Sequence, residues 1–351
     1  MFDPDFYKGK KILVTGHTGF KGTWLCSILV HAGAEVTGYS LPPEDEPNLF
    51  QLSGLEQRMR SVIGDIRDLA HLRQVFEESQ PEIVFHLAAQ PLVRRSYEEP
   101  VYTYDTNVMG TVNILECVRT HSCVRSFLNV TTDKVYDNKE RAEGYREEEP
   151  LDGYDPYSNS KSCSELVTHS YKRSFFTDGR CAISTARAGN VIGGGDFAKD
   201  RIIPDCIRAA SNGETIRVRN PYSVRPYQHV IEPLCAYLMI AQKQFEDPAF
   251  AGCYNVGPDV ADCVTTRELV TLFCEKWGDG QTWINTAEAN APHEATFLRL
   301  DCTKLKTVFG WSPRWNVETA IEKVIQWTKV YLQQGDITGC MTQQFTDFIN
   351  H

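Results

Sequence analysis

The sequence predicts an α/β protein in which a doubly wound parallel sheet is followed by a smaller C-terminal lobe. Short apolar segments alternate with longer amphipathic segments through the first half of the chain, which is the pattern of βαβ units. The short segments are apolar throughout, as strands buried on both faces are. After about Gly189 this rhythm ends, and prolines 204, 221, 226, 233 and 258 separate shorter elements. We therefore expect one domain over residues 1–189 and a second over residues 190–351, with the chain free to cross back to the sheet.

Apolar and amphipathic periodicity places the individual elements. Strands are expected at Lys11–Thr15, Glu35–Ser40, Ser61–Ile63, Glu82–Ala88, Ser126–Thr131 and Cys181–Ala186. Helices are expected at Thr23–His31, Leu69–Ser79, Asn107–Thr120 and Ser158–Ser174. A further short strand, Thr215–Val218, is expected in the C-terminal lobe. The charged segment Asp137–Asp155 lies between a strand end and a helix, where functional loops are common.

Composition argues against several protein classes. The 351 residues include 36 Lys and Arg and 46 Asp and Glu, for a net charge of −10, which argues against nucleic-acid binding. No apolar run approaches the roughly 18 residues of a membrane span, and no secretory signal is recognisable. The twelve cysteines form no C-x-x-C pair and the nine histidines form no H-E-x-x-H pattern. We expect a cytoplasmic protein with reduced thiols and without a metal site.

A glycine-rich turn follows the first strand and opens the first helix. Its residues are Gly16, His17, Thr18, Gly19, Phe20, Lys21 and Gly22. Glycines permit a tight turn and close backbone approach, and a helix N-terminus offers free N–H groups to a pyrophosphate. The strand–turn–helix context therefore predicts a Rossmann-type dinucleotide site rather than a merely tight turn. Lys21 is either a cation near the pyrophosphate or a solvated side chain.

The expected ribose end of this site is unusual. An NAD site commonly has an acidic residue after the second strand, for the ribose hydroxyls. Here the chain reads Gly38-Tyr39-Ser40-Leu41, with neither a carboxylate nor an arginine that would indicate NADP. We predict NAD, held more loosely than in proteins that have the carboxylate.

Tyr157 and Lys161 form a Y-x-x-x-K motif on a predicted helix. Residues four apart lie one turn apart on the same face. The lysine is expected to stabilise the phenolate and lower a pKa that is ordinarily about 10. A phenolate can remove a hydroxyl proton while hydride leaves the same carbon. Downstream of a dinucleotide turn, this motif predicts catalysis.

Thr131–Tyr136 reads T-T-D-K-V-Y at the end of the fifth strand, where ligands bind in such sheets. With the G-x-x-G-x-x-G turn and the Y-x-x-x-K motif, it resembles the extended short-chain dehydrogenase/reductase family. T-D-K resembles the T-D-E triplet of nucleotide-sugar 4,6-dehydratases, and T-D-K before Y-D-N resembles the branch that acts on CDP-glucose. The alternative is a Thr/Asp cap or loop stabiliser. The resemblance covers residues 9–330 and includes His86–Pro91, Thr106–Thr111, Arg187–Asp196, Arg225–Val230, Tyr254–Gly257, His293–Ala295 and Gly310–Pro313.

The resemblance implies a redox-neutral dehydration of CDP-glucose with tightly held NAD. Tyr157 takes the 4-hydroxyl proton while hydride leaves C4, and Thr132 hydrogen-bonds the reacting oxygen. The 4-ketone makes the C5 proton acidic, water leaves across C5 and C6, and hydride returns to C6. Asp133 matches the acid that protonates the departing hydroxyl. The product is a 4-keto-6-deoxy sugar.

Lys134 occupies the position of the base that removes the C5 proton. A lysine begins near pKa 10.4 and must be neutral to accept a proton, whereas an ionised neighbour such as Asp133 raises its pKa. Lys134 could instead stay charged and stabilise the enolate oxygen. Both roles remain open.

The resemblance also implies cofactor and substrate contacts. Asp65 matches an adenine contact, with a helix N-cap as the alternative. Ile66, Leu87, Ala88 and Ala89 are expected beside the cofactor, together with Tyr157 and Lys161. Asn190 and Arg225 match substrate contacts, Arg225 at the pyrophosphate, for which arginine is well suited. Further substrate candidates are Gln90, Asn107, which is otherwise a buried structural amide, and Arg201 and Arg299, which otherwise form surface salt bridges.

Two other functions compete with the dehydratase. A nucleotide-sugar epimerase uses the same tyrosine, lysine and NAD, but needs no acid to expel water, so Asp133 and Lys134 favour the dehydratase. A silent nucleotide-binding protein would usually lack Tyr157 or Lys161. The helices Asn107–Thr120 and Ser158–Ser174 resemble the family's dimer-forming pair, which predicts a homodimer, although their apolar faces could equally pack internally.

Overall fold

The computed structural model describes residues 2–44, 46–287 and 297–350, and the motif His293–Ala295 lies outside them. Its centre is a seven-stranded sheet in the order β3-β2-β1-β4-β5-β6-β11, with all neighbours parallel. The strands are β1 (Lys11–Thr15), β2 (Glu35–Ser40), β3 (Arg60–Ile63), β4 (Ile83–His86), β5 (Ser126–Thr132), β6 (Ala182–Ala188) and β11 (Cys253–Val256). The predicted Rossmann-type sheet is confirmed, and β11 adds a strand from the C-terminal half.

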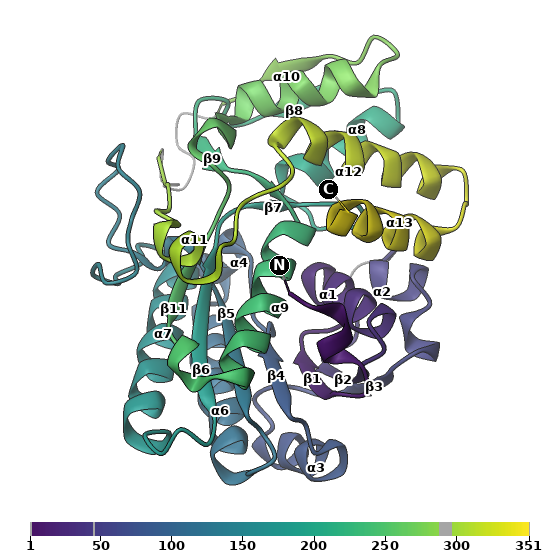
Figure 1. The fold of residues 1–351 in the computed structure, drawn as a ribbon. Helices are drawn as coiled ribbons and strands as arrows, with labels where there is room; N and C mark the ends of the chain where they lie inside the picture. The colour runs from purple at the N-terminus through teal and green to yellow at the C-terminus, as the bar shows by residue number, and fades with distance from the viewer. Residues whose placement is uncertain (1, 45, 288–296, 351) are drawn as a thin grey trace.

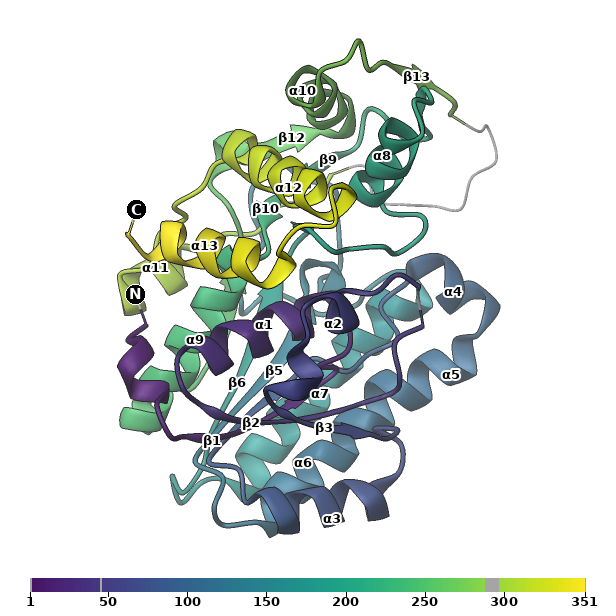
Figure 2. The same cartoon turned by 90° about the vertical axis from the view of Figure 1, so that its right-hand side faces the viewer.

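Helices cover both faces of this sheet (Figures 1 and 2). The helices of the first half and α9 are α1 (Phe20–His31), α2 (Leu49–Leu52), α3 (Leu69–Ser79), α4 (Val93–Glu98), α5 (Pro100–Tyr104), α6 (Gly110–Thr120), α7 (Pro156–Phe175) and α9 (Ile231–Glu246). Alternate strand residues face opposite layers. Ile12 and Val14 pack in the core that contains α1 and α9, whereas Leu13 packs in the core that contains α3 and α6. This two-sided burial explains the continuous apolar strands.

Most predicted elements form close to their expected bounds. β1, β2 and α3 match the predicted ranges, whereas β4 is shorter than Glu82–Ala88. α1 begins at Phe20 rather than Thr23, with Gly19 as its N-cap. The predicted helix Asn107–Thr120 is divided, because residues 105–109 form a π-helical turn before α6. The predicted strand Thr215–Val218 forms as β8, over Ile216–Val218. The predictions did not include α4, α5 or the other short elements of the lobe.

The rest of the chain builds a second group of elements at one end of the molecule (Figure 1). It contains α8 (Ile202–Ser211), α10 (Thr266–Trp277), α11 (Thr303–Phe309), α12 (Val317–Leu332), α13 (Ile337–Asn350), β7 (Val191–Ile192), β8 (Ile216–Val218), β9 (Val224–Pro226), β10 (Gln228–His229), β12 (Cys263–Thr265) and β13 (Trp283–Asn285). Ile203, Val218, Phe273 and Ile321 belong to its separate apolar core. α11 and α13 instead join the core of the sheet around α1 and α9, and α11 lies beside β11 (Figure 1), which ties the C-terminal segment to the sheet.

Within the described ranges, no helix is both long enough and apolar enough to span a bilayer. All twelve cysteines are free thiols. Four of them are buried within the two large cores of the sheet, Cys26 and Cys235 on one face and Cys117 and Cys181 on the other, and Cys206 is buried in the core of the lobe.

Candidate functional site

A cavity of about 1370 Å³ lies between the carboxyl ends of the strands and the C-terminal elements. Gly16 follows β1, Ser40 ends β2 and Leu87 follows β4, and all three line the cavity. Val218 and Arg225 line it from the C-terminal half. The strand order reverses between the neighbouring strands β1 and β4. Ligands bind at such a reversal in open α/β sheets.

The glycine turn forms the floor of this cavity. Gly16 has a φ of +77°, and a Cβ there would lie 2.8 Å from the backbone nitrogen of Ala88. A Cβ on Gly22 would lie 2.0 Å from the Gly16 carbonyl oxygen. Larger residues would therefore disrupt both the turn and the start of α1. Six of the seven predicted turn residues line the cavity: Gly16, Thr18, Gly19, Phe20, Lys21 and Gly22.

His17 is the turn residue that is absent from the cavity lining. Its Nε2 lies 2.8 Å from the Ser61 hydroxyl, and its ring packs edge-on to Phe50. Burial lowers the pKa of His17 to about 4. A Cβ on Gly38 would lie 2.2 Å from this ring, so Gly38 makes room for it. His17 thus packs beneath the turn.

Hydroxyl groups occupy the end of β2. The Oγ1 of Thr18 lies 2.9 Å from the Oγ of Ser40 and donates to the carbonyl oxygen of Leu41. Asp65 lines the cavity and accepts from the Arg67 guanidinium at 2.7 Å, which lowers its pKa. The N-cap of α3 is Asp68, so the N-cap alternative for Asp65 is wrong. Ile66, Leu87, Ala88 and Ala89 also line the cavity.

Lys21 is one of the residues that line this cavity. Burial, together with the nearby cation of Arg201, lowers the pKa of its ammonium to about 7. An anion placed in the cavity would oppose both effects, because an opposite charge favours the protonated form. The alternative of a freely solvated lysine is therefore wrong.

Tyr157 and Lys161 lie one turn apart near the start of α7, and both line the cavity. Asp155 caps this helix by accepting from the Ser158 backbone at 3.0 Å. Burial raises the pKa of Tyr157 to about 12, although a hydrogen bond with Thr132 lowers it. Burial lowers the pKa of Lys161 to about 8, and its ammonium donates to the Val130 carbonyl at 3.2 Å. The expected lowering of the Tyr157 pKa is therefore wrong here, since desolvation of the phenol outweighs its polar contacts.

The Thr132–Asp133–Lys134 turn stands beside this pair. The Thr132 hydroxyl donates to Asp133 Oδ1 at 3.0 Å, and the Lys134 ammonium donates to the same oxygen at 3.1 Å. Lys134 also reaches Asn190 Oδ1 at 3.5 Å. Thr132 and Lys134 line the cavity, whereas Asp133 is fully buried just behind its wall. The Oδ2 of Asp133 has no hydrogen-bond partner in the described part of the chain.

The predicted substrate residues divide into two groups. Gln90, Asn190, Arg201 and Arg225 line the cavity, and Arg201 pairs with Asp196 at 2.9 Å. Asn107 and Arg299 are not among the lining residues.

Local contacts explain why these two side chains do not reach the cavity. The Asn107 amide is buried between the Gln90 backbone, at 2.9 Å, and the Ser160 hydroxyl, at 2.9 Å, so it is the structural amide that was the alternative. Arg299 donates to the Ala142 carbonyl at 3.3 Å.

Sequence reasoning missed six further cations that line the cavity: Arg94, Arg95, Lys139, Lys199, Arg217 and Arg219. Arg94 and Arg95 lie on α4, a helix that was not predicted. Lys139 lies in the segment between β5 and α7, and the other three lie on loops and a short strand of the C-terminal half. No periodic pattern distinguishes such residues from ordinary surface cations.

Comparison with known proteins identifies the family. The model of the family described as GDP-mannose 4,6 dehydratase matches residues 13–324, which is most of the chain. The chain belongs to this family. The matched region spans both the central sheet and the C-terminal lobe.

Relatives with established names are similar over their whole length. A CDP-glucose 4,6-dehydratase of Salmonella typhimurium is 46% identical, with 100% of this chain and 99% of the relative covered. A probable dTDP-glucose 4,6-dehydratase of Sinorhizobium fredii is 29% identical, with 93% of each covered.

Among solved structures, dTDP-glucose 4,6-dehydratase from Bacillus anthracis in complex with NAD has a TM-score of 0.79 at 21% identity, covering 94% of this chain and 100% of that chain. UDP-glucose 4-epimerase from Thermotoga maritima also has a TM-score of 0.79, at 22% identity, with 92% and 99% covered. At these identities the likeness shows the fold alone.

Proposed function

We propose that the protein is a lyase that converts CDP-glucose to CDP-4-keto-6-deoxyglucose with NAD as cofactor. The observation that carries the proposal is the contact of Lys134 with Asp133, next to Thr132, whose hydroxyl is hydrogen-bonded to Tyr157 at the cavity wall. A 4-epimerase needs the tyrosine and lysine but no group that expels water. The relative named CDP-glucose 4,6-dehydratase, 46% identical over the full chain, supports both the reaction and the cytosine base.

The residues around the glycine turn fit NAD. Gly16 and Gly22 leave no room for a Cβ, so the backbone can approach a pyrophosphate closely at the N-terminus of α1. Lys21 adds a cation. Thr18 and Ser40 present hydroxyls at the ribose end, and Asp65 and Ile66 stand at the adenine end. NAD supplies, when bound, a cationic ring that takes the C4 hydride and later returns it to C6.

Tyr157 acts first as the base that receives the proton of the sugar 4-hydroxyl. A cation close to the phenol opposes the burial that raises its pKa. Thr132 donates to or accepts from the same oxygen, since its hydroxyl is already within hydrogen-bond range of Tyr157. Lys161 lies one turn further along α7 and stabilises the phenolate that acts as base. C4 thereby becomes a ketone.

Water loss follows at C5 and C6. The ketone makes the C5 proton acidic, and the Asp133 carboxylate takes that proton. The electron pair of the C5–H bond moves into an enolate, whose charge Lys134 stabilises. Asp133 gives a proton to the 6-hydroxyl, so that the C6–O bond breaks and water leaves. Hydride return to C6 and a proton at C5 complete the 4-keto-6-deoxy sugar. Substrate and product have the same oxidation level apart from the lost water.

The two halves of the chain divide this work. Residues 1–189 hold NAD and the catalytic groups, and residues 190–351 mainly hold the nucleotide sugar. Arg225 is largely buried at the cavity wall and binds the substrate pyrophosphate, with Arg201 beside it. Asn190 and Gln90 contact the sugar. Arginine suits these positions because its planar fork matches phosphate oxygens.

We further propose a cytoplasmic homodimer formed through the outer faces of α6 and α7. Leu166 and Phe175 of α7 are 54% and 47% exposed, and Met109 before α6 is 48% exposed. Apolar side chains gathered on adjacent helices support an interface. Light scattering should give twice the chain mass, and Leu166→Glu should shift it to the monomer. A wild-type monomer would contradict the dimer.

Proton NMR of the purified protein with NAD and CDP-glucose in heavy water tests the function. We expect a new C6 methyl signal, deuterium at C5 and no net reduction of NAD. UDP-, GDP- and dTDP-glucose should react poorly. An altered ring-proton coupling pattern without a methyl signal would instead indicate an epimerase. No change with any of these sugars would refute the proposal.

A further inference from the structure

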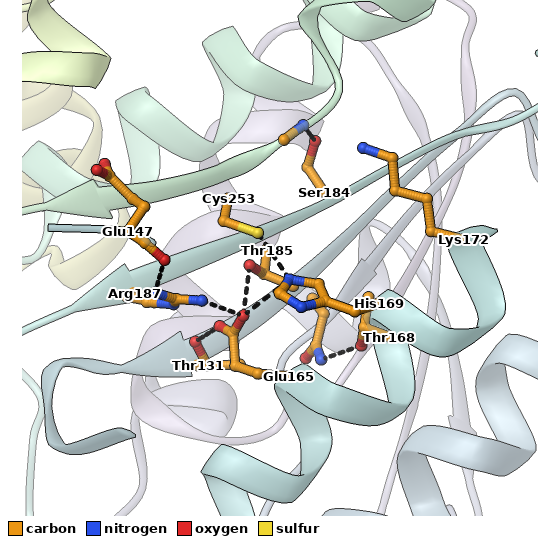
Figure 3. Close-up of polar contacts among 12 residues, drawn as sticks. Thr131, Glu147, Glu165, Thr168, His169, Lys172, Ser184, Thr185, Arg187 and Cys253 are labelled. Carbon is orange, nitrogen blue, oxygen red and sulfur yellow. Dashed lines mark hydrogen bonds and ion pairs between the residues drawn. The ribbon is translucent and has the colours of Figure 1, made fainter. Parts of the chain in front are cut away.

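A fully buried ion pair lies behind the turn formed by Thr132, Asp133 and Lys134, which we call the catalytic turn. Arg187 of β6 and Glu165 of α7 have no exposed side-chain surface, and Nη2 of Arg187 lies 2.9 Å from Oε2 of Glu165. Figure 3 shows Glu165 at the centre of contacts from Thr131, Thr185 and Arg187. Burial raises the pKa of Glu165, but the Arg187 cation and the hydrogen bonds from Arg187, Thr131 and Thr185 together outweigh burial and hold the pKa below its usual range. The carboxylate is thus ionised and fully occupied by donors.

The Glu165–Arg187 pair makes hydrogen bonds to the chain on both sides of the catalytic turn. Before the turn, the Thr131 hydroxyl donates to Oε1 of Glu165 at 2.5 Å. After the turn, Nη1 of Arg187 donates to the Tyr136 hydroxyl at 2.9 Å. Thr131 directly precedes Thr132, and Tyr136 follows two residues after Lys134. One ion pair therefore fixes the chain at both ends of the segment that carries Thr132, Asp133 and Lys134.

The same network fixes the loop that follows. Arg187 also donates to the Glu147 carbonyl at 2.9 Å. The Tyr136 hydroxyl donates to Asn255 Oδ1 at 2.6 Å, and the Asn255 backbone donates to the Glu147 carboxylate at 2.8 Å. Tyr136 and Glu147 both lie in the segment between β5 and α7, so the contacts hold this segment against β6 and β11.

Other functions of this cluster fit less well. His169 and Cys253 lie beside Glu165, and their ligand atoms and its carboxylate are close enough together to suggest a metal site. Yet the Glu165 oxygens already accept from Thr131, Thr185 and Arg187. The Arg187 cation at 2.9 Å would also repel a metal ion. Nor is a buried ion pair strong evidence for stabilisation, because desolvation offsets its attraction.

We infer that Glu165 and Arg187 are positioning residues that hold Asp133 and Lys134 in place for the water-loss step. This inference rests on the proposed function. Tyr157 and Lys161 sit on α7, a helix of 20 residues, whereas Asp133 and Lys134 sit on a single 3₁₀ turn of three residues, Asp133–Val135. Loosening the pair therefore impairs water loss more than oxidation at C4.

Two matched substitutions test the inference. Thr131→Val removes the Glu165 hydrogen bond next to the catalytic turn. Thr185→Val removes another hydrogen bond to the same carboxylate, at 2.8 Å, from within β6 and away from the turn. We expect Thr131→Val to slow C6 methyl formation about tenfold, the effect of losing one hydrogen bond to a charged group. Thr185→Val should stay within about twofold of the wild type.

The readout must separate positioning from general loss of structure. With Thr131→Val, the absorbance of reduced cofactor should rise during turnover, because C4 oxidation continues while water loss lags. NAD affinity and KM should be unchanged. Arg187→Lys keeps the positive charge but lacks the planar, forked guanidinium, and this variant should also accumulate reduced cofactor during turnover. Equal methyl formation by both valine variants, or slowing without accumulated reduced cofactor, would overturn the inference. A wild type without methyl product would refute the proposed function instead.

Discussion

The ammonium of Lys134 lies 3.1 Å from Oδ1 of Asp133, a carboxylate with no exposed side-chain surface. The second carboxylate oxygen of Asp133, Oδ2, has no hydrogen-bond partner within the described ranges. An acid and a cation are thus held together at the place where water must leave and where enolate charge must be stabilised. In the proposed mechanism, Lys134 stabilises the enolate from beside this carboxylate.

This arrangement predicts different outcomes for two Lys134 variants. Arginine stays protonated and cannot act as a base, but it keeps the positive charge. Lys134→Arg should therefore retain measurable exchange of the C5 proton with heavy water. Lys134→Met should slow this exchange about 100-fold or more, which is the usual effect of removing an electrostatic stabiliser. Proton NMR measures both rates, and equal loss in the two variants would instead make Lys134 the base.

Tyr157→Phe removes the hydroxyl that exchanges a proton with the sugar. We expect kcat to fall by about 10²–10⁴-fold, the usual contribution of a general base. NAD affinity should change little. Tyr171→Phe, on the same helix but not among the cavity-lining residues, is the control and should keep full activity. Substantial activity in Tyr157→Phe would assign the base to another residue.

Arg225 and Arg299 offer a direct comparison of two predicted substrate cations. Arg225 lines the cavity, whereas Arg299 turns toward Ala142. Arg225→Met should raise KM for CDP-glucose by roughly 10–100-fold, since a hydrogen bond to a charged group contributes about 1.5–3 kcal/mol. Arg299→Met should leave KM within a few-fold of the wild type. Steady-state kinetics distinguish them, and a reversed order would contradict the assignment.

The ribose end predicts that NAD binding can be strengthened. Ser40 ends β2, and its hydroxyl lies 2.9 Å from the hydroxyl of Thr18. Ser40→Asp places a carboxylate where NAD-binding sheets commonly have one. We expect a lower Kd for NAD, by about tenfold, in calorimetric titration. Ser40→Asn has the same shape without the charge and should give a smaller gain; submicromolar binding by the wild type would contradict the looser-retention prediction.

Glu232 of α9 predicts a pH dependence of stability. Burial raises its pKa from 4.5 to about 7, although it accepts from the backbones of Arg314 and Trp315 at 2.8 and 2.6 Å. Because the folded pKa lies above the unfolded one, the stabilisation is complete below pH 4.5 and is lost as pH rises to about 7.

The variant Glu232→Gln keeps an acceptor and removes this titration. Relative to the variant, the wild type should therefore lose roughly 1–3 kcal/mol of unfolding free energy across that pH range. Urea unfolding at several pH values measures the difference. Parallel stability curves for the two proteins would show that Glu232 does not titrate as expected.

Local patterns were enough to place the sheet and the reactive motifs. Continuous apolar strands, such as Lys11–Thr15, appear directly in the sequence because burial on both faces leaves no polar alternation. The glycine turn and the four-residue spacing of Tyr157 and Lys161 depend only on neighbouring residues. Those features therefore could be predicted without knowledge of long-range contacts.

Features that depend on distant residues could not. The alternatives for Asn107 were settled by Gln90 and Ser160, and the direction of Arg299 by Ala142. The pKa of Tyr157 rises because the folded chain removes water from the phenol, a quantity that no local spacing encodes. The pairing of Glu165 with Arg187 joins α7 to β6 across 22 residues. Such contacts arise only when the helices and the sheet pack, since burial and charge proximity are properties of the assembled layers.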